Sequence, residues 1–233
     1  MSDNMTLGKA EILGLLCAEG NYRGYIAIYF EKNRKRKAVY LRECWKEIIE
    51  FSNTDVTLLR HFVSLLSNEY NYQPKIIKSN NNVFRVCITK NNVIRDLLKY
   101  TDFGCLKWSI SPSILKSDHL VKAAFIRGFF DGDGSVDYVD KKIPRIRFGS
   151  SNFNGLKMLS KLLESISLKH SLNGPYLQYN RMPSFELLLR TSSIKDFVNF
   201  IGSRHKNKNI EFQKIIAEGR NAEIDKIYPQ PHN

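Results

Sequence analysis

The spacing of apolar and polar residues predicts the same series of elements twice along the chain. In the first half, apolar residues at helical spacing indicate helices, and runs rich in Tyr, Ile and Val indicate strands. The expected elements are, in order, a helix at about Lys9–Ala18, strands near Tyr22–Glu31 and within Val39–Phe51, a helix at Val56–Asn68, strands at Lys75–Lys78 and Phe84–Thr89, and a helix at Val93–Tyr100.

The second half is expected to repeat this order after an irregular stretch at Gly104–Pro112. Its elements are a helix at about Leu120–Phe130, strands near Ser135–Val139 and Arg145–Ser150, a helix ending near Ser167, strands near Tyr176–Tyr179 and Phe185–Arg190, a helix at Ile194–Ile201, and a last helix from about Asn209 to Glu218.

Two stretches of the halves align without a gap. Phe84–Tyr100 lies against Phe185–Ile201, and Val56–Leu66 lies against Phe153–Leu163. The chain is therefore interpreted as a two-copy internal repeat with the order α-β-β-α-β-β-α in each copy. This predicts an α+β fold of two halves related by a pseudo-two-fold axis, with domains at 1–114 and 115–220 and a tail at 221–233.

Composition favours a nucleic-acid-binding protein. The 233 residues include 36 Lys+Arg against 23 Asp+Glu, which gives a formal net charge of +13. The excess is spread over both halves, so it is not a single basic tail. The four cysteines are scattered, without metal-site or disulfide spacing, which favours an intracellular, reducing compartment. We see neither an 18-residue apolar run nor a signal-peptide core, so no membrane span and no secretion are expected.

The two predicted helices that open the copies end in related motifs, Ile12–Gly20 and Ile126–Gly134. Each has small residues four apart on one face, where another helix can approach closely. These residues are Gly14 and Ala18 in the first copy and Gly128 and Gly132 in the second. If the two helices pack in parallel across the pseudo-dyad, their C-terminal ends meet.

An acid precedes the final glycine of each motif, Glu19 in the first and Asp133 in the second. These acids lie at the negative end of the helix dipole, where they are unfavourable unless a cation binds. Adjacent carboxylates must share a proton or bind cations, and their oxygens suit Mg²⁺. A calcium loop at Asp131 is excluded because Val136 and Lys142 occupy its required Gly and Glu positions.

Together the two motifs resemble the paired signature of the LAGLIDADG homing endonucleases, in their single-chain, two-motif form. The resemblance implies a four-stranded antiparallel, saddle-shaped sheet from each half straddling double-stranded DNA. It implies a Mg²⁺ site (Mn²⁺ or Ca²⁺ can occupy it) at Glu19 and Asp133, with the carbonyls of Ala18 and Gly132. It further implies a double-strand break across the minor groove. Cys17 departs from the pattern, since the second copy has Asp131 there.

Basic and polar residues near the scissile phosphates are also implied by the resemblance. By position the basic candidates are Lys107 in the first half, and Lys206 or Lys208 in the second. The polar role falls to Asn53 or Asp55 and to Ser151 or Asn152, all of which could equally be plain helix N-caps.

DNA is expected to be read by side chains on one face of each sheet, and strand alternation turns about half of any candidate set away from it. The candidates of the first half are Arg23, Tyr25, Tyr29, Arg34, Lys35, Arg36, Lys37, Lys75, Lys78 and Arg85. Those of the second half are Tyr138, Lys141, Arg145, Arg147, Tyr176, Gln178, Tyr179, Arg181 and Arg190.

The leading hypothesis is a site-specific, Mg²⁺-dependent DNA endonuclease that acts as a monomer without an obligate protein partner. Two alternatives of another class stay open. One is an intron maturase that binds intron RNA, and the other is a non-cleaving DNA-binding protein of the same fold. The retained acids at both motif ends favour the nuclease.

Overall fold

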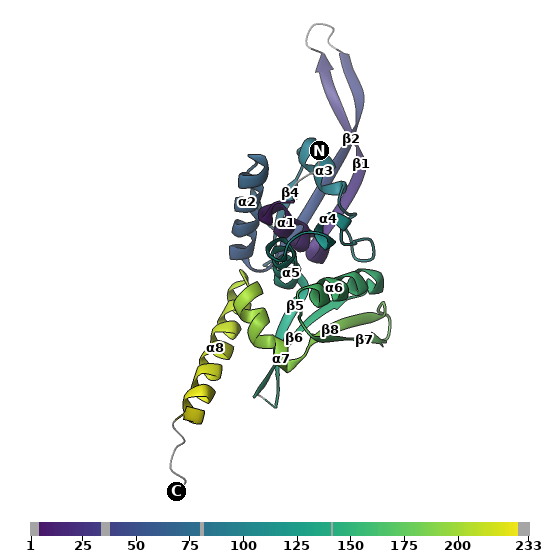
Figure 1. Ribbon diagram of the computed structural model, residues 1–233. Coiled ribbons are helices and arrows are strands. Elements are labelled where there is room, and N and C mark those ends of the chain that lie inside the picture. Colours follow the sequence, from purple (N-terminus) through teal and green to yellow (C-terminus); the bar gives the residue numbers. More distant parts are fainter. Residues whose placement is uncertain (1–4, 34–37, 80–81, 141, 228–233) are drawn as a thin grey trace.

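The structure is a computed structural model that describes residues 5–33, 38–79, 82–140 and 142–227. Two halves of like architecture stack end to end (Figure 1). The first half comprises α1 (Leu7–Glu19), β1 (Gly20–Asn33), β2 (Ala38–Asn53), α2 (Val56–Tyr70), β3 (Ile76–Lys78), β4 (Phe84–Ile88) and α3 (Asn91–Leu98), and the short α4 (Pro112–Leu115) follows it.

The second half has the same order of elements. It comprises α5 (His119–Asp133), β5 (Gly134–Val139), β6 (Ile143–Ser150), α6 (Phe153–Ser165), β7 (His170–Tyr176), β8 (Ser184–Leu189), α7 (Thr191–Asp196), the π-helix η1 (Phe197–Ile201) and α8 (Lys206–Ile227). The strand orders of the two antiparallel sheets, β1-β2-β4-β3 and β5-β6-β8-β7, are the same. The predicted α+β fold with a pseudo-two-fold repeat is confirmed.

Strand register shows that the repeat is residue-for-residue. In the first sheet Phe51 pairs with Gly20 and with Val86. In the second, Phe148 pairs with Gly134 and with Leu187 in the same arrangement. Each position of one sheet therefore has a defined equivalent in the other, and the face carrying these apolar residues packs on the helices.

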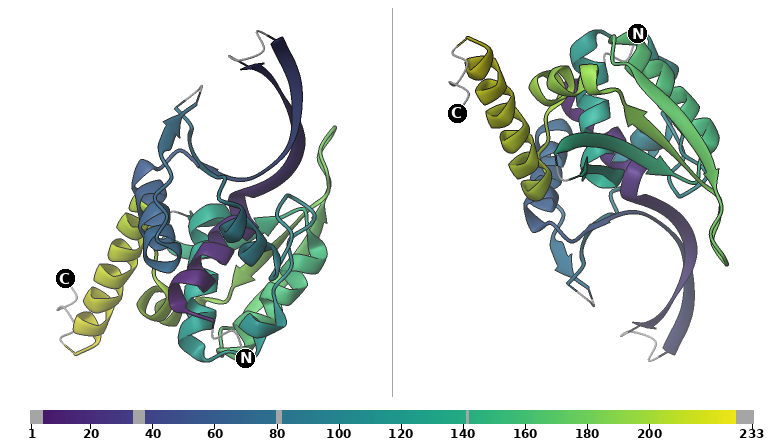
Figure 2. Two further views of the ribbon diagram at one scale, coloured as in Figure 1. Left: turned by 90° about the horizontal axis from the view of Figure 1, so that it is seen from above. Right: turned by 90° about the horizontal axis from the view of Figure 1, so that it is seen from below.

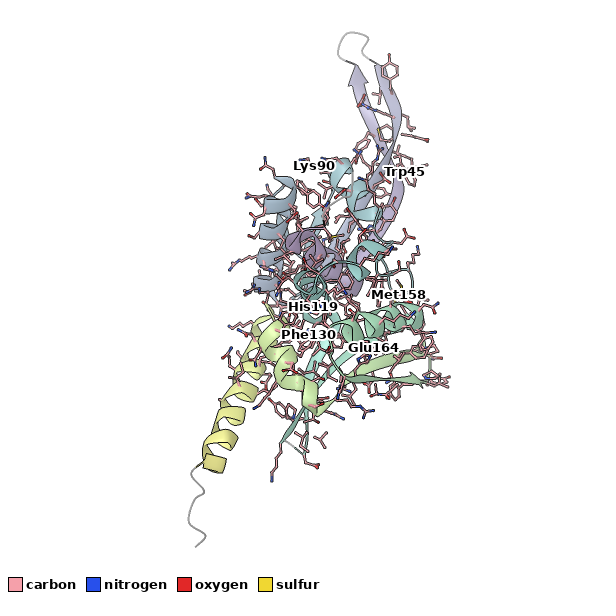
Figure 3. All side chains as sticks on the ribbon, in the orientation of Figure 1. Trp45, Lys90, His119, Phe130, Met158 and Glu164 are labelled. Carbon is pink, nitrogen blue, oxygen red and sulfur yellow. The ribbon has the colours of Figure 1, made fainter. Side chains whose placement is uncertain are left out.

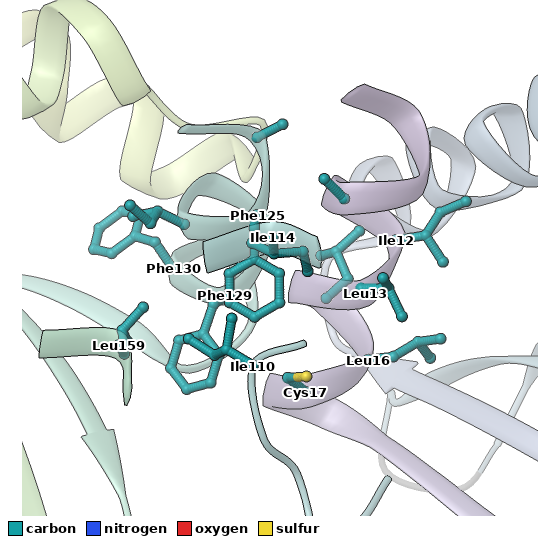
Figure 4. Packing of buried hydrophobic residues seen from close by; sticks show 14 of the residues in the cluster. Ile12, Leu13, Leu16, Cys17, Ile110, Ile114, Phe125, Phe129, Phe130 and Leu159 are labelled. Carbon is teal, nitrogen blue, oxygen red and sulfur yellow. The ribbon is translucent and has the colours of Figure 1, made fainter. Parts of the chain in front are cut away.

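The helices α1 and α5 lie side by side in the core between the halves (Figure 4). They approach most closely at their glycines. A Cβ on Gly14 would lie 2.1 Å from the carbonyl oxygen of Phe125, and one on Gly128 would lie 2.3 Å from that of Glu11. At the helix ends, a Cβ on Gly132 would lie 2.4 Å from the Cβ of Ala18. These contacts require small side chains and confirm the predicted parallel packing of the motif helices.

A buried ion pair also joins the two helices. Glu11 of α1 accepts a 2.6 Å hydrogen bond from Arg127 of α5 and lies 2.8 Å from His61 of α2. Burial alone raises the pKa of Glu11, but the hydrogen bonds and charges of His61 and Arg127 lower it to about 2. This ion pair was not predicted from the sequence.

Several element boundaries differ from the predicted ones. The helix α5 continues to Asp133, so Asp131 and Asp133 lie within its last turn rather than after it. Gly20 and Gly134 have φ of −82° and −75°, which any residue can adopt, so their backbone conformation does not require glycine. The glycines are needed for space, because a Cβ on Gly134 would lie 2.1 Å from the ring of Phe130.

Two segments near the C-terminus were placed wrongly. The strand expected near Tyr176–Tyr179 is instead β7, His170–Tyr176. β7 is an edge strand whose hydrogen-bonded neighbour is β8. Edge strands tolerate polar residues, so the sequence of β7 lacks the apolar alternation that would have predicted a strand. The last helix, α8, extends to Ile227 and so enters the segment expected to be a tail.

The hairpin β1–β2 distinguishes the halves. Its strands have 14 and 16 residues, whereas β5 and β6 have 6 and 8. The hairpin curves away from the rest of the molecule (Figure 2), and Trp45 lies on this projecting part (Figure 3).

Across the described part of the chain, no helix combines the length and apolarity that a membrane crossing needs.

Candidate active site

The C-terminal ends of α1 and α5 meet at one pocket of about 450 Å³. Both predicted acids, Glu19 and Asp133, line it together with Ala18. The remaining lining residues come from the starts of β1, the end of β6 and the segment after α3: Gly20, Asn21, Gly104, Cys105, Trp108, Gly149, Ser150 and Ser151. The two copies therefore contribute to a single site.

Burial raises the pKa of both carboxyl groups in this pocket. Burial is the main cause that raises the pKa of Glu19, and the charge of Lys208 opposes it. Burial and then the negative charge of Glu19 raise the pKa of Asp133 to about 7, again against Lys208. The pocket therefore holds closely spaced acidic groups that a cation would stabilise in their ionised form.

Lys208, at the start of α8, caps the C-terminal end of α5. Its Nζ donates to the carbonyl oxygens of Phe130 at 2.6 Å, Asp131 at 2.8 Å and Gly132 at 3.3 Å. A cation is favourable there because the helix dipole is negative at this end. Burial lowers the pKa of Lys208 to about 8, against the charges of Asp131, Asp133, Glu19 and Asp55. At neutral pH it therefore stays largely protonated.

The other basic candidates lie elsewhere. The backbone N–H of Lys206 donates to Asp55, and the residue is exposed. Lys107 is also exposed, on the segment whose Gly104, Cys105 and Trp108 line the pocket. Extending the gapless alignment of the halves pairs Lys107 with Lys208, and this signal could have separated Lys208 from Lys206 in the sequence.

Asp131, two positions before the predicted ligand Asp133, is fully buried. Its carboxylate accepts hydrogen bonds from the hydroxyl of Ser203 and, at 2.8 Å, from the backbone N–H of Arg204. Asp131 thus fixes the segment that leads into α8 and Lys208. Its counterpart Cys17 is buried as well, with its Sγ 3.9 Å from the carbonyl oxygen of Ser109, and burial raises the pKa of its thiol.

The polar candidates at the strand-to-helix junctions hold the halves together. Asp55 caps α2 through the N–H of Thr57 and accepts a 2.8 Å hydrogen bond from the N–H of Lys206, across the two halves. Its equivalent Asn152 caps α6 and donates at 2.7 Å to the carbonyl oxygen of Trp108. Each N-cap residue therefore forms a hydrogen bond with the segment of the opposite half that carries a candidate lysine.

The other two polar candidates have different positions. Asn53 accepts from the backbone N–H of Asp55 and so supports that cap. Ser151 lines the pocket. The alternative of plain N-caps is confirmed for Asp55 and Asn152, with the contact across the halves as an addition that the sequence did not show.

Many of the predicted DNA-reading residues lie on the sheet face opposite the helices. By register, this open face carries Arg23, Tyr25, Tyr29, Arg85, Arg145 and Arg147. All four arginines are paired with acids that the sequence analysis did not single out: Glu50, Asp137 and Glu186. Tyr176 also donates to Glu186, at 3.1 Å.

Other predicted DNA-reading residues lie off this face. Alternation turns Tyr138 toward α8, where its hydroxyl donates to Glu211 at 3.0 Å. Lys78 pairs with Phe84 on the helix side of the sheet, and Arg190 occupies the N-cap position of α7 without a side-chain hydrogen bond to that helix. Lys75, Gln178, Tyr179 and Arg181 are exposed in loops. Arg34, Lys35, Arg36, Lys37 and Lys141 lie outside the described residues.

In the described ranges, the candidate metal ligands form a pair of carboxylates rather than a larger cluster of side chains. None of their His, Cys, Asp and Glu side chains form a group of three or more that could hold a metal ion. Glu19 and Asp133 supply two carboxylates, and further oxygens must come from backbone carbonyls, water or a bound phosphate. The carbonyl of Gly132, a predicted ligand, already accepts from Lys208.

Comparison with known proteins gives a family match in the second half and a fold match over most of the chain. Residues 120–202 match the model of the LAGLIDADG-like domain. A curated relative, the probable cell division protein WhiA of Clostridium novyi (strain NT), is 29% identical over 186 residues, which cover 73% of this chain and 56% of the relative. The chain thus spans about half the length of that protein.

Solved structures of two homing endonucleases share the fold. The structure of I-DmoI in complex with DNA and Mn matches with a TM-score of 0.59 and 17% identity, covering 85% of this chain and 98% of that chain. I-SmaMI bound to uncleaved DNA in the presence of calcium ions matches with a TM-score of 0.59 and 13% identity, covering 92% of each chain. The predicted resemblance to single-chain, two-motif LAGLIDADG proteins is confirmed.

Proposed function

We propose that this LAGLIDADG-fold protein is a site-specific endonuclease that hydrolyses one phosphodiester bond in each strand of double-stranded DNA, across the minor groove of a long recognition site. The observation that carries the proposal is the meeting of Glu19 and Asp133 in one pocket at the ends of α1 and α5. The DNA complexes of I-DmoI and I-SmaMI support it at the level of fold.

The chemistry of the pocket fits a divalent cation. Burial, and then the negative charge of Glu19, raise the pKa of Asp133 to about 7. Glu19 and Asp133 would hold the ion, with the carbonyl of Ala18 and oxygens from the DNA completing its shell. Such an ion supplies charge neutralisation at the scissile phosphate and lowers the pKa of bound water. Mg²⁺ is proposed, and Mn²⁺ or Ca²⁺ would suit the same oxygens.

The residues of the chain have separate tasks in this proposal. Glu19 and Asp133 concentrate negative charge where the cation and the phosphate meet. Lys208 neutralises the end of α5 and keeps three carbonyls from facing the phosphate unpaired. Asp131 holds the segment that delivers Lys208. Lys107, exposed beside the pocket, is free to reach the phosphate backbone from the first half.

The proposal is of a monomer, because one chain supplies both acids and both sheets. Double-stranded DNA is the proposed substrate, and the open sheet faces are its proposed binding surface. An intracellular, reducing compartment is proposed as well. All four cysteines are free thiols, which is compatible with it.

A two-stage experiment tests the function. Duplexes that bind the wild-type protein are selected from a randomised library in EDTA and then incubated with the protein and Mg²⁺. Wild type is expected to cut both strands, and Glu19→Gln/Asp133→Asn to bind the same duplexes but cut at least about 1,000-fold more slowly. The exposed carboxylate variant Glu164→Gln is the control and should cut as wild type. Equal rates in wild type and the double variant would contradict the assignment.

A non-cleaving DNA-binding role is the second candidate. Several curated relatives are named as probable cell division proteins rather than as nucleases, and this favours it. It predicts sequence-specific binding in the first stage of the experiment and intact duplexes in the second, with Mg²⁺ or Mn²⁺. Selective binding of intron RNA in place of duplex DNA would favour the maturase hypothesis.

A further inference from the structure

The open faces of the two sheets carry ion networks at equivalent positions but with opposite charges. In the first half Glu50 of β2 lies between Arg23 of β1 and Arg85 of β4, at 3.3 and 3.5 Å. In the second half Arg147 of β6 lies between Asp137 of β5 and Glu186 of β8, the latter at 3.4 Å. An acid between two bases has become a base between two acids.

Register establishes the equivalence. Arg23 lies three residues after the first motif glycine, as Asp137 does after the second, and Gly20 and Gly134 occupy the same place in their sheets. Glu50 directly precedes Phe51, and Arg147 directly precedes the equivalent Phe148. Arg85 and Glu186 directly precede Val86 and Leu187, which pair with those phenylalanines. All three positions of the network are therefore inverted.

The second network has one additional member. Arg145 of β6 binds Asp137 with two nitrogens, at 2.8 and 3.1 Å. The equivalent position in the first sheet, two residues before Glu50, is Ile48. Within these networks, guanidinium groups therefore lie on β1 and β4 of the first sheet and on β6 of the second.

The networks are accessible and close to the pocket. Arg23 is four residues from Glu19, and its side chain is 53% exposed. Arg85 and Arg147 are 39% and 33% exposed, and the Nε of each is buried without a hydrogen-bond partner. Their acids fix these guanidinium groups in place, and a fixed guanidinium is suited to bidentate contact with guanine. Carboxylates reject the same groove position and favour cytosine.

We propose that these charge-inverted networks are specificity determinants that make the two halves prefer different bases at equivalent positions of the DNA site. The first half takes guanine contacts from β1 and β4, and the second half takes them from β6. Exchanging one network for the other should make the two half-sites alike at those positions. The inference rests on the proposed DNA-binding function, but it does not require cleavage.

The test transplants the second network into the first half. The variant Arg23→Asp/Ile48→Arg/Glu50→Arg/Arg85→Glu and the wild type are each used to select duplexes from a randomised library in EDTA. The wild-type consensus is expected to differ between half-sites at the base pairs under the networks. In the variant, the first half-site should change to the bases of the second, with a preference of about tenfold over the original base.

Two further variants complete the design. The converse transplant, Asp137→Arg/Arg145→Ile/Arg147→Glu/Glu186→Arg, should give both half-sites the bases of the first. It carries the test if the first transplant does not fold. Lys214→Gln on α8 lowers the net charge by one, as the first transplant does, and should keep the wild-type consensus.

The outcomes separate this inference from the proposed function. A wild-type consensus that is unchanged in both folded transplants would overturn the inference and leave DNA binding intact. A consensus that shifts equally in Lys214→Gln would overturn it too, since net charge would then be the cause. Absence of any enriched duplex with wild type would overturn both the inference and the function.

Discussion

The C-terminal ends of α1 and α5 are equivalent in the repeat, but they differ in the hydrogen bonds that support them. At the end of α5, Asp131 holds the following segment through two hydrogen bonds, and Lys208 caps three carbonyls. At the end of α1, Cys17 replaces the acid, and its Sγ lies 3.9 Å from the carbonyl oxygen of Ser109. Lys107, the counterpart of Lys208, is exposed.

The two copies therefore share the helix crossing and the motif carboxylates, but they do not share the hydrogen bonds that support the helix ends. Both helices keep a glycine at the crossing and a carboxylate before the last residue of the motif. The supporting network is complete in the second copy only. We therefore expect substitutions at the crossing to affect both copies equally and substitutions in the support to affect mainly the second.

The crossing should give the largest effect. Gly14→Ala and Gly128→Ala each place a Cβ within 2.3 Å of the backbone of the opposite helix, so each should lower the free energy of unfolding by about 3 kcal/mol or more. Gly149→Ala is the control, because no atom lies within 4 Å of its Cβ position, and it should change stability by about 0.5 kcal/mol or less. Denaturant unfolding measures all three. A tolerated Gly128→Ala would contradict the crossing.

The supporting acid should separate the copies. Asp131→Ala leaves the Ser203 hydroxyl and the Arg204 N–H buried without their acceptor, so it should cost about 3 kcal/mol. Cys17→Ala removes one sulfur atom from the core and should cost about 1 kcal/mol. Equal losses of stability in the two variants would mean that the copies are supported alike.

The two lysines should differ in the same direction. Lys208→Met removes the cap of α5 and should lower the free energy of unfolding by about 2 kcal/mol. Lys107→Met should leave stability within about 0.5 kcal/mol, because the side chain is exposed. Thermal unfolding compares them. Strand-resolved cleavage then shows whether Lys107 nevertheless contributes to cutting, which the proposed function expects.

The pH dependence of stability should show how unfavourable the ionised form of Asp133 is in the pocket. Asp133 keeps its proton up to a pKa of about 7 in the folded protein but releases it near 3.8 when unfolded. Its contribution therefore makes stability fall as pH rises from about 4 to 7. Asp133→Asn should flatten this slope and be more stable than wild type at pH 7 by about 1 kcal/mol.

Two controls sharpen the pH experiment. Glu11, with its pKa lowered to about 2, acts in the opposite direction: its stabilisation is present above pH 4.5 and is lost as pH falls toward 2. It should be unaffected by Asp133→Asn. Mg²⁺ should raise the melting temperature of wild type at pH 7 but not that of Glu19→Gln/Asp133→Asn. An identical response to Mg²⁺ would place its binding elsewhere.

The sequence was sufficient for features that follow from local pattern. The repeat, the crossing glycines and the pairing of Glu19 with Asp133 follow from residue types at fixed spacings. The strand β7 was misplaced because its partner β8, rather than its own composition, makes it a strand. The role of Asp131 was missed because Ser203 and Arg204 are far from it in the chain.

The networks on the sheet faces show the same limit. The arginines were found as candidates because DNA binding calls for cations, but Glu50, Asp137 and Glu186 were not. Their relation appears only when strand register places three strands side by side. Register depends on long-range pairing, which apolar spacing within one strand does not specify.

The most direct test of the central claim is the rate at which each DNA strand is cut by the two single variants, Glu19→Gln and Asp133→Asn, in Mg²⁺. We predict that each carboxamide lowers the cutting of the selected duplex by at least about 100-fold, while affinity for the duplex stays within about threefold of wild type. Wild-type cutting of both strands by either variant would contradict a centre shared by the two helix ends.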